Sequence, residues 1–144
     1  MARIKIELPV EFGFTAAIPV RITDLNYGGH VGNDTILSLI HEARVQFLSH
    51  HGYTTELNLD GIGLIMTDAA IEFKSELFYG ETVLASVAVS SFTKFGFEIY
   101  YKLEKPLAEK KSLVAAAKTG MLCFDYGKKK IASVPEEVRR KLMG

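Results

Sequence analysis

Residues 24–51 read DLNYGGHVGNDTILSLIHEARVQFLSHH, and this stretch decides the fold. Its first ten residues hold three glycines, two asparagines and an aspartate, which is typical of a loop. From Asp34 to His51 apolar residues recur at spacings of three and four, which predicts an amphipathic helix. Asn33 suits its N-cap, and Gly52 follows its last turn. No other stretch predicts a helix of this length.

Strand patterns lie on both sides of this helix. A short apolar run, residues 15–22, precedes the loop, and its Pro19 favours the edge of a sheet. Four longer strands are predicted at residues 64–74, 82–91, 95–103 and 112–124. Their short connections, including a charged turn at residues 104–111, favour an antiparallel meander. A capping box at Ser133 predicts a short terminal helix to Met143. The predicted class is α+β, with one long central helix wrapped by an antiparallel β-sheet.

Composition narrows the possible functions. The chain has 144 residues, and we expect one domain over residues 1–144. Its 17 basic and 17 acidic residues cancel, which argues against a general nucleic-acid binder. The single cysteine, Cys123, lies in an apolar run and is expected in the core, and the histidines lack metal-ligand spacing. We therefore expect no metal and no cofactor. Without a signal peptide or a membrane-length apolar run, a cytoplasmic protein is predicted.

The loop and helix together resemble the hot-dog fold thioesterases of the 4-hydroxybenzoyl-CoA thioesterase-like branch. The family pattern D-x-D-x-x-G-H-V-N-N and the E-x-R that follows it are matched by Asp24, Gly29, His30, Val31, Asn33, Glu42 and Arg44. The resemblance covers roughly residues 18–138 and implies hydrolysis of acyl-CoA or acyl-carrier-protein thioesters. It also implies a homodimer or a dimer of dimers. Unpaired strands at the edges of a sheet also favour self-association. We expect the sheets of two copies to join edge to edge, with the ligand cleft at their junction.

The resemblance breaks at the residue that matters most for chemistry. Asn26 stands where the family has its second Asp, the usual nucleophile or general base. An asparagine cannot take a proton from water at neutral pH, although it could orient a water or hold the thioester carbonyl. Four acids could serve as the base instead, namely Asp24, Asp34, Glu42 and Asp68.

The start of the helix is the predicted oxyanion site. Free N–H groups near Asn33 and the helix dipole would stabilise the developing negative charge. The residues expected to contact substrate are Tyr27, Gly29, Gly32 and Asn33. His30 could act as an acid or base, but a loop residue bonded to the backbone is the favoured interpretation.

Plainer roles compete for two of the acids and for one basic run. Glu42 could form an ion pair with Arg44 or with a neighbouring subunit. Asp68 could be an exposed strand residue or could face the helix. The run Lys128–Lys130 could be a solvated turn or could meet the phosphates of coenzyme A.

Two other functions stay open beside hydrolysis. Asp24, Asn26 and His30 resemble the D-x-N-P-x-H arrangement of hot-dog enoyl-CoA hydratases, although the proline is missing and His30 lies one residue further along. A non-catalytic acyl-thioester binding protein is the second alternative, since the chain lacks the family's usual carboxylate. Neither alternative involves nucleic acid or a membrane.

Overall fold

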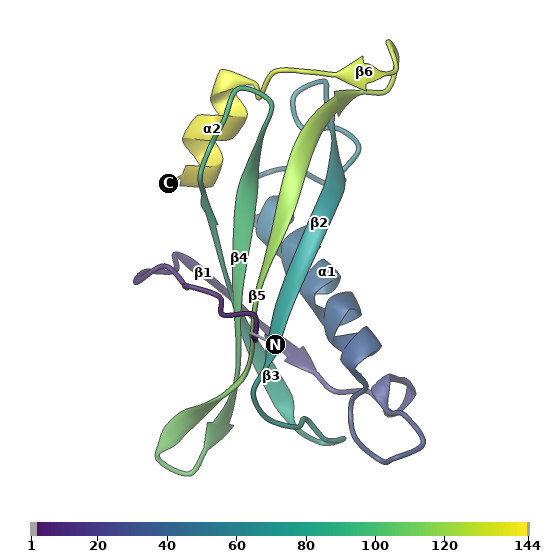
Figure 1. Ribbon diagram of the computed structural model, residues 1–144, viewed down its shortest axis with the longest axis vertical. Coiled ribbons are helices and arrows are strands. Elements are labelled where there is room, and N and C mark those ends of the chain that lie inside the picture. Colours follow the sequence, from purple (N-terminus) through teal and green to yellow (C-terminus); the bar gives the residue numbers. More distant parts are fainter. Residues whose placement is uncertain (1–2, 144) are drawn as a thin grey trace.

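One antiparallel sheet and one long helix make up most of the molecule (Figure 1). The computed structural model describes residues 3–143. In chain order the elements are β1 (Phe14–Pro19), the 3-10 helix η1 (Ile22–Asp24), α1 (Asn33–His50), β2 (Gly63–Phe73), β3 (Thr82–Ser90), β4 (Gly96–Leu107), β5 (Lys110–Asp125), β6 (Lys130–Ile131) and α2 (Glu136–Met143). The predicted α+β class with a single long helix is therefore confirmed.

The strand order is β1-β3-β4-β5-β2, with the short β6 paired to the end of β5. Strands β3, β4 and β5 form a meander, but β2 pairs with β5 and not with β3, so the predicted four-strand meander is wrong. Residues 74–81 carry the chain from β2 across to β3, and the Val31 N–H donates to the Leu77 carbonyl of this connection at 2.8 Å. The sheet therefore has edges at β1 and β2. The edge position predicted from Pro19 is confirmed.

Helix α1 packs against one face of the sheet (Figure 1), and the side of the helix that is buried there is apolar. The buried apolar side chains of this side are Ile36, Leu39, Ile40, Ala43, Phe47 and Leu48. Each large one contributes roughly 2 kcal/mol by leaving water. The N-cap is Gly32 and Asn33 is already helical, which corrects the predicted cap. The Gly32 carbonyl accepts the N–H groups of Thr35 and Ile36, so no side chain is needed there.

Several predicted boundaries shift. The first strand ends at Pro19, and Ile22 belongs to η1. The turn predicted over residues 104–111 is wrong, since β4 and β5 stay paired as far as Leu107 and Lys110. The capping box at Ser133 does not open α2, whose Arg139 N–H donates to the Pro135 carbonyl.

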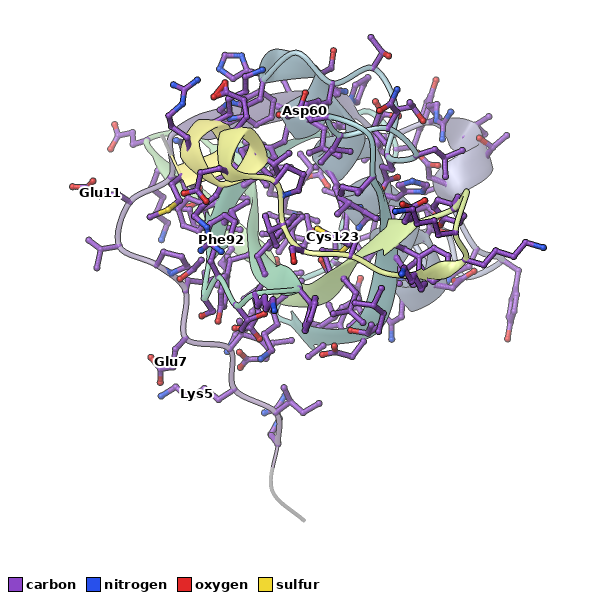
Figure 2. All side chains as sticks on the ribbon, turned by 90° about the horizontal axis from the view of Figure 1, so that it is seen from above. Lys5, Glu7, Glu11, Asp60, Phe92 and Cys123 are labelled. Carbon is purple, nitrogen blue, oxygen red and sulfur yellow. The ribbon has the colours of Figure 1, made fainter. Side chains whose placement is uncertain are left out.

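The N-terminal segment, residues 3–13, runs along the face of the sheet opposite α1 (Figure 1). One contact that holds it is the Ile6 N–H, which donates to Glu72 Oε1 at 3.0 Å. Lys5, Glu7 and Glu11 point outward, whereas Cys123 lies inside the molecule (Figure 2). Cys123 is fully buried, and burial raises the pKa of its thiol to about 11, so the predicted core position is confirmed.

Candidate functional site

Asp24 has a structural task at the start of the loop. Its side chain is almost fully buried, and Oδ2 accepts the Arg21 backbone N–H at 2.8 Å. The guanidinium of Arg21 lies 3.2 Å from Oδ1. These contacts cap η1 and fix the entry to the loop. A carboxylate that is buried and bonded in this way is poorly placed to take a proton from water.

Asn26 organises the tight turn that follows. Its Oδ1 accepts the Gly28 N–H at 2.8 Å, and its carbonyl accepts the Gly29 N–H at 3.1 Å. Gly29 has φ +85, a left-handed conformation that favours glycine. Oδ1 is engaged, and within residues 3–143 no hydrogen bond involves Nδ2, which lies beside Gly32. Tyr27 is fully exposed at the tip of this turn.

The first turn of α1 completes the arrangement. The N–H groups of Asn33 and Asp34 belong to this turn, where no carbonyl of the helix can accept them. A Cβ on Gly32 would lie 2.6 Å from Asp34 Oδ1 and 3.6 Å from Asn26 Nδ2, so both side chains close over the glycine. We call Asn26, Gly32, Asn33 and Asp34 the Gly32 cradle. It brings an amide donor and a carboxylate together at the start of α1, whose first N–H groups have no acceptor within the helix.

A hollow of about 260 Å³ lies beside the cradle. It is lined by His30, Val31, Asn33, Ile36 and residues 73–77. Within it, His30 Nδ1 donates to the Val31 carbonyl at 3.1 Å, and its ring meets Phe78 edge-on. This matches the favoured interpretation of His30 as a loop residue bonded to the backbone. The hollow can accept an apolar group next to the free amides.

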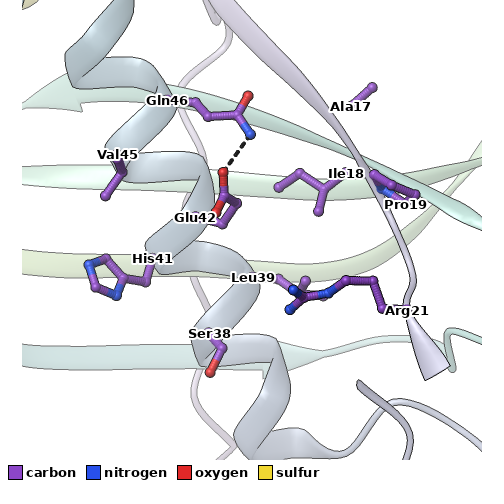
Figure 3. Close-up of a pocket in the computed structure, with 10 residues that line it drawn as sticks. All are labelled: Ala17, Ile18, Pro19, Arg21, Ser38, Leu39, His41, Glu42, Val45 and Gln46. Carbon is purple, nitrogen blue, oxygen red and sulfur yellow. Dashed lines mark hydrogen bonds between the residues drawn. The ribbon is translucent and has the colours of Figure 1, made fainter. Parts of the chain in front are cut away.

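The structure does not bring Glu42 or Asp68 to the cradle. Glu42 lies two turns further along α1, on its exposed side, and accepts from Gln46 at 2.7 Å (Figure 3). There it borders a separate hollow of about 350 Å³ between α1 and β1. Of the two ion-pair partners considered for Glu42, the structure contradicts Arg44, whose guanidinium bonds Glu56 and Tyr101 instead.

Asp68 lies on the face of the sheet away from α1. The register of β2 shifts between Met66 and Asp68, so that Asp68 pairs with Gly120 and accepts the Thr67 hydroxyl at 2.8 Å. Thr119, the residue before Gly120 on β5, lies on the helix side of the sheet, where its hydroxyl bonds Tyr101. Successive residues of a strand point to opposite faces, so Gly120 and its partner Asp68 lie on the other face. The expectation that Asp68 faces the helix is therefore wrong, and its exposed position is confirmed.

A buried polar cluster under α1 was missed from the sequence. Arg44 Nε donates to Glu56 Oε2 at 2.8 Å, and Nη1 donates to the Tyr101 hydroxyl at 3.2 Å. Tyr101 in turn shares a hydrogen bond with Thr119, and His41 Nε2 lies 2.6 Å from Glu56 Oε1. Burial opposes the charge on Arg44, but its neighbouring oxygens raise its pKa overall. The E-x-R match flagged Arg44, but no local pattern points to Glu56.

Glu56 keeps its charge in this cluster. Burial raises the pKa of Glu56, but hydrogen bonds from Arg44 and His41 outweigh it and lower the pKa overall. Within residues 3–143, no group of three or more His, Cys, Asp or Glu side chains is placed to hold a metal ion. In the same part of the chain no helix is long and apolar enough to cross a membrane.

A long helix wrapped by a sheet of this strand order, with free amides at the helix start, defines the hot-dog class. The chain belongs to the thioesterase-like superfamily, whose family model matches residues 20–142. A Microcystis aeruginosa protein named 1,4-dihydroxy-2-naphthoyl-CoA hydrolase is 29% identical over 125 residues, which cover 85% of this chain and 88% of that protein.

Solved structures share the fold. One is a 1,4-dihydroxy-2-naphthoyl-CoA thioesterase from Synechocystis, 23% identical with a TM-score of 0.79 over 90% of this chain and 94% of that one. Another is a mutant 4-hydroxybenzoyl CoA thioesterase complexed with 4-hydroxybenzoyl CoA, 14% identical with a TM-score of 0.80 over 90% of this chain and 97% of that one. The predicted hot-dog fold and family are both confirmed.

Proposed function

We propose that this chain hydrolyses acyl-CoA thioesters at the Gly32 cradle. The observation that carries the proposal is that Asn26 Nδ2 and the Asp34 carboxylate meet at Gly32, the residue that precedes the first-turn amides of α1. Such amides point at the position where an oxyanion forms, and a well-aimed donor is worth about 3 kcal/mol in the transition state. Membership of a thioesterase superfamily supports the same reaction class.

Asp34 is the general base in this proposal. It takes a proton from a water molecule, whose oxygen attacks the thioester carbon while the carbonyl oxygen becomes an oxyanion. The N–H groups of Asn33 and Asp34, with Asn26 Nδ2, bind that oxyanion. Its collapse breaks the carbon–sulfur bond, and the proton passes from Asp34 to the leaving thiolate. The products are a free acid and a thiol.

Asp34 is preferred over the other three acids because of where they lie. Asp24 is buried and bonded to Arg21, Glu42 lies two turns along the helix, and Asp68 is on the opposite face of the sheet. The position of Asp24 also weighs against the hydratase alternative, which needs that carboxylate near substrate. The two relatives named for 1,4-dihydroxy-2-naphthoyl-CoA make this thioester a first substrate to test.

The test compares two acids on one helix. We expect Asp34→Asn to lower kcat by roughly 10²-fold or more, because general-base help is lost. Glu42→Gln is the matched control and should leave kcat unchanged. Hydrolysis is followed by thiol release from a panel of acyl-CoA and acyl-carrier-protein thioesters. If wild-type protein binds acyl-CoA but releases no thiol from any of them, the binding-protein alternative replaces this proposal.

The proposal includes a second copy of the chain. Strand β2 pairs with β5 along one side only, and within residues 3–143 no strand covers its other side. A long open edge favours pairing with another strand. We therefore place the sheet-to-sheet contact at β2, which brings the partner next to the hollow beside the cradle. Light scattering should report a dimer or a dimer of dimers, and a monomer of 15.9 kDa at micromolar concentration contradicts it.

A further inference from the structure

The turn between β5 and β6 carries three consecutive lysines, Lys128–Lys130, which we call the lysine turn. Every residue from 126 to 131 is exposed. The Lys128 N–H donates to Asp125 Oδ1 at 3.0 Å, which fixes the shape of the turn. With three lysines against one aspartate, residues 125–131 carry a net charge of +2 in a chain that is neutral overall. The lysine turn is therefore a local basic patch.

The other run of three basic residues, 139–141, carries its own counterions. It lies on α2, where Arg139 is 4.0 Å from Glu136 and Arg140 pairs with Glu137. The lysine turn has fewer acidic residues near it in the sequence than it has lysines. Ammonium groups gathered in this way attract a ligand that carries several negative charges, and phosphate groups are ligands that lysine binds well.

The lysine turn and the Gly32 cradle lie at opposite ends of β2. The turn follows Tyr126, whose ring lies against Gly63, the first residue of β2. The hollow beside the cradle is lined by residues 73–77, which end β2 and follow it. Along a strand of eleven residues this separation is roughly 33 Å. Figure 1 shows β6 and the start of α1 at opposite ends of the sheet. A substrate at the cradle is therefore far from the lysine turn of its own chain.

The middle of β2 marks where a second copy joins. Residues 66–69 are all exposed, between the half-buried Ile65 and Ala70. Since neighbouring residues of a strand point to opposite faces, this stretch is open on both faces. Two copies joined there about a two-fold axis perpendicular to the sheet run antiparallel, with both α1 helices on one face. The start of β2 in the partner then lies opposite the end of β2 in this chain.

We propose that the lysine turn of the partner subunit binds the phosphates of a coenzyme A thioester whose thioester group lies at the Gly32 cradle of this chain. The inference rests on the proposed function, including its sheet-to-sheet contact at β2. The pantetheine arm holds the phosphates roughly 15 Å from the sulfur, by the reach of an extended chain. The phosphates therefore lie outside the cradle, on the side where the partner begins its β2. Three ammonium groups also favour coenzyme A over a carrier protein, whose arm has one phosphate.

Two charge-matched double variants test which lysines bind the phosphates. Lys128→Gln with Lys129→Gln removes two exposed charges from the lysine turn, and Lys110→Gln with Lys111→Gln removes two from the start of β5. The reference substrate is the N-acetylcysteamine thioester of the same acyl group, which has no phosphate. We expect kcat/KM for the CoA thioester, relative to the reference, to fall about tenfold in the first variant only, as for two exposed charge contacts. No change in the first variant, or an equal fall in both, overturns the inference.

Mixed dimers show which subunit supplies the lysines. One subunit carries Asp34→Asn, the other carries Lys128→Gln with Lys129→Gln, and different affinity tags isolate the mixed dimer. Its one working cradle belongs to the subunit with substituted lysines and faces the intact lysine turn of the partner subunit. We expect the KM of wild type with about half its kcat. The raised KM of the lysine variant means that the lysines act within their own chain, and it overturns the inference, as does a monomer in light scattering.

Calorimetry keeps the inference independent of catalysis. Coenzyme A itself is titrated into wild type and into the two double variants. The Kd should rise about tenfold in the variant of the lysine turn only, and the difference should shrink as the salt concentration rises. This result supports the inference even if no thioester is hydrolysed, in which case only the proposed function fails. Coenzyme A that binds all three proteins equally, or none of them, overturns the inference.

Discussion

Two regions of α1, the Gly32 cradle at its start and the cluster around Arg44 further along, which we call the Arg44 end, hold their polar groups in opposite ways. At the Gly32 cradle the donors are mainly backbone amides, and the side chains of Asn26 and Asp34 are exposed. At the Arg44 end every group is a side chain, and most are buried and bonded to one another. Because the side chains of the cradle are exposed, we expect substitutions there that keep the Asn26 turn bond to cost little stability, which makes it a site where chemistry can vary. The Arg44 cluster does not tolerate such substitutions, because a lost partner leaves a buried charge.

Replacing one side chain in the cradle should have the largest effect on rate. Asn26→Asp supplies a carboxylate beside the free amides of α1, where Oδ1 can still accept the Gly28 N–H. We expect kcat/KM to rise by up to roughly 10²-fold, less than the full range of general-base help because Asp34 already serves as a base. The measurement is thiol release from the best acyl-CoA substrate.

The control for this gain is the same substitution without the native base. The double variant Asn26→Asp with Asp34→Asn should be far faster than Asp34→Asn alone, since the new carboxylate replaces the lost base. If Asn26→Asp is no faster than wild type, the lack of a carboxylate at position 26 does not limit the rate of hydrolysis. The free energy of unfolding of Asn26→Asp should stay close to that of wild type, because Asn26 is exposed.

Removing a side chain from the other end should cost stability. Arg44→Met leaves Glu56 without its guanidinium and Tyr101 without one of its partners. We expect the free energy of unfolding to fall by about 3 kcal/mol, as for a broken buried pair. Urea unfolding measures it. Arg140→Met, which breaks an exposed pair with Glu137 on α2, is the control and should cost less than about 1 kcal/mol. If Arg44→Met and Arg140→Met lose similar free energies of unfolding, the Arg44 cluster contributes no more stability than an exposed ion pair, and the contrast drawn here is wrong.

The sequence predicted the loop and the helix start that form the cradle far better than the contacts of the Arg44 cluster. These two elements are contiguous, so composition and periodicity predicted them, and the family resemblance pointed to Asn26 within them. Arg44 meets Glu56 and Tyr101 across 12 and 57 residues, and no periodicity carries such a contact. For the same reason the meander prediction failed, because local alternation does not say that β2 pairs with β5. The bulge that turns Asp68 outward is equally invisible to alternation.

A methyl group in the cradle should weaken catalysis without much harm to folding. In Gly32→Ala the new Cβ meets Asp34 Oδ1 at 2.6 Å, so the carboxylate must move. The backbone at Gly32 has φ −72, which alanine adopts freely. We expect kcat to fall roughly tenfold to hundredfold, the effect of a misplaced catalytic group. Gly13→Ala, where a Cβ meets nothing within 4 Å, is the control. A normal kcat in Gly32→Ala contradicts the placement of Asp34.

The smallest expected effect is a pH dependence that belongs to the Arg44 end alone. Hydrogen bonds from Arg44 and His41 hold the pKa of Glu56 below its ordinary value of 4.5, despite the opposing effect of burial. Glu56 therefore adds stability that is fully present above pH 4.5 and is lost as the pH falls through its lowered pKa in the folded state.

Urea unfolding of wild type and Glu56→Gln at a series of pH values measures this contribution. The wild type should be more stable near neutral pH, and the gap should narrow below pH 4.5, because the protonated Glu56 is as neutral as glutamine. Other carboxylates titrate alike in both proteins and cancel in the difference. A gap that stays constant down to the acid transition shows that the charge of Glu56 contributes nothing to the cluster.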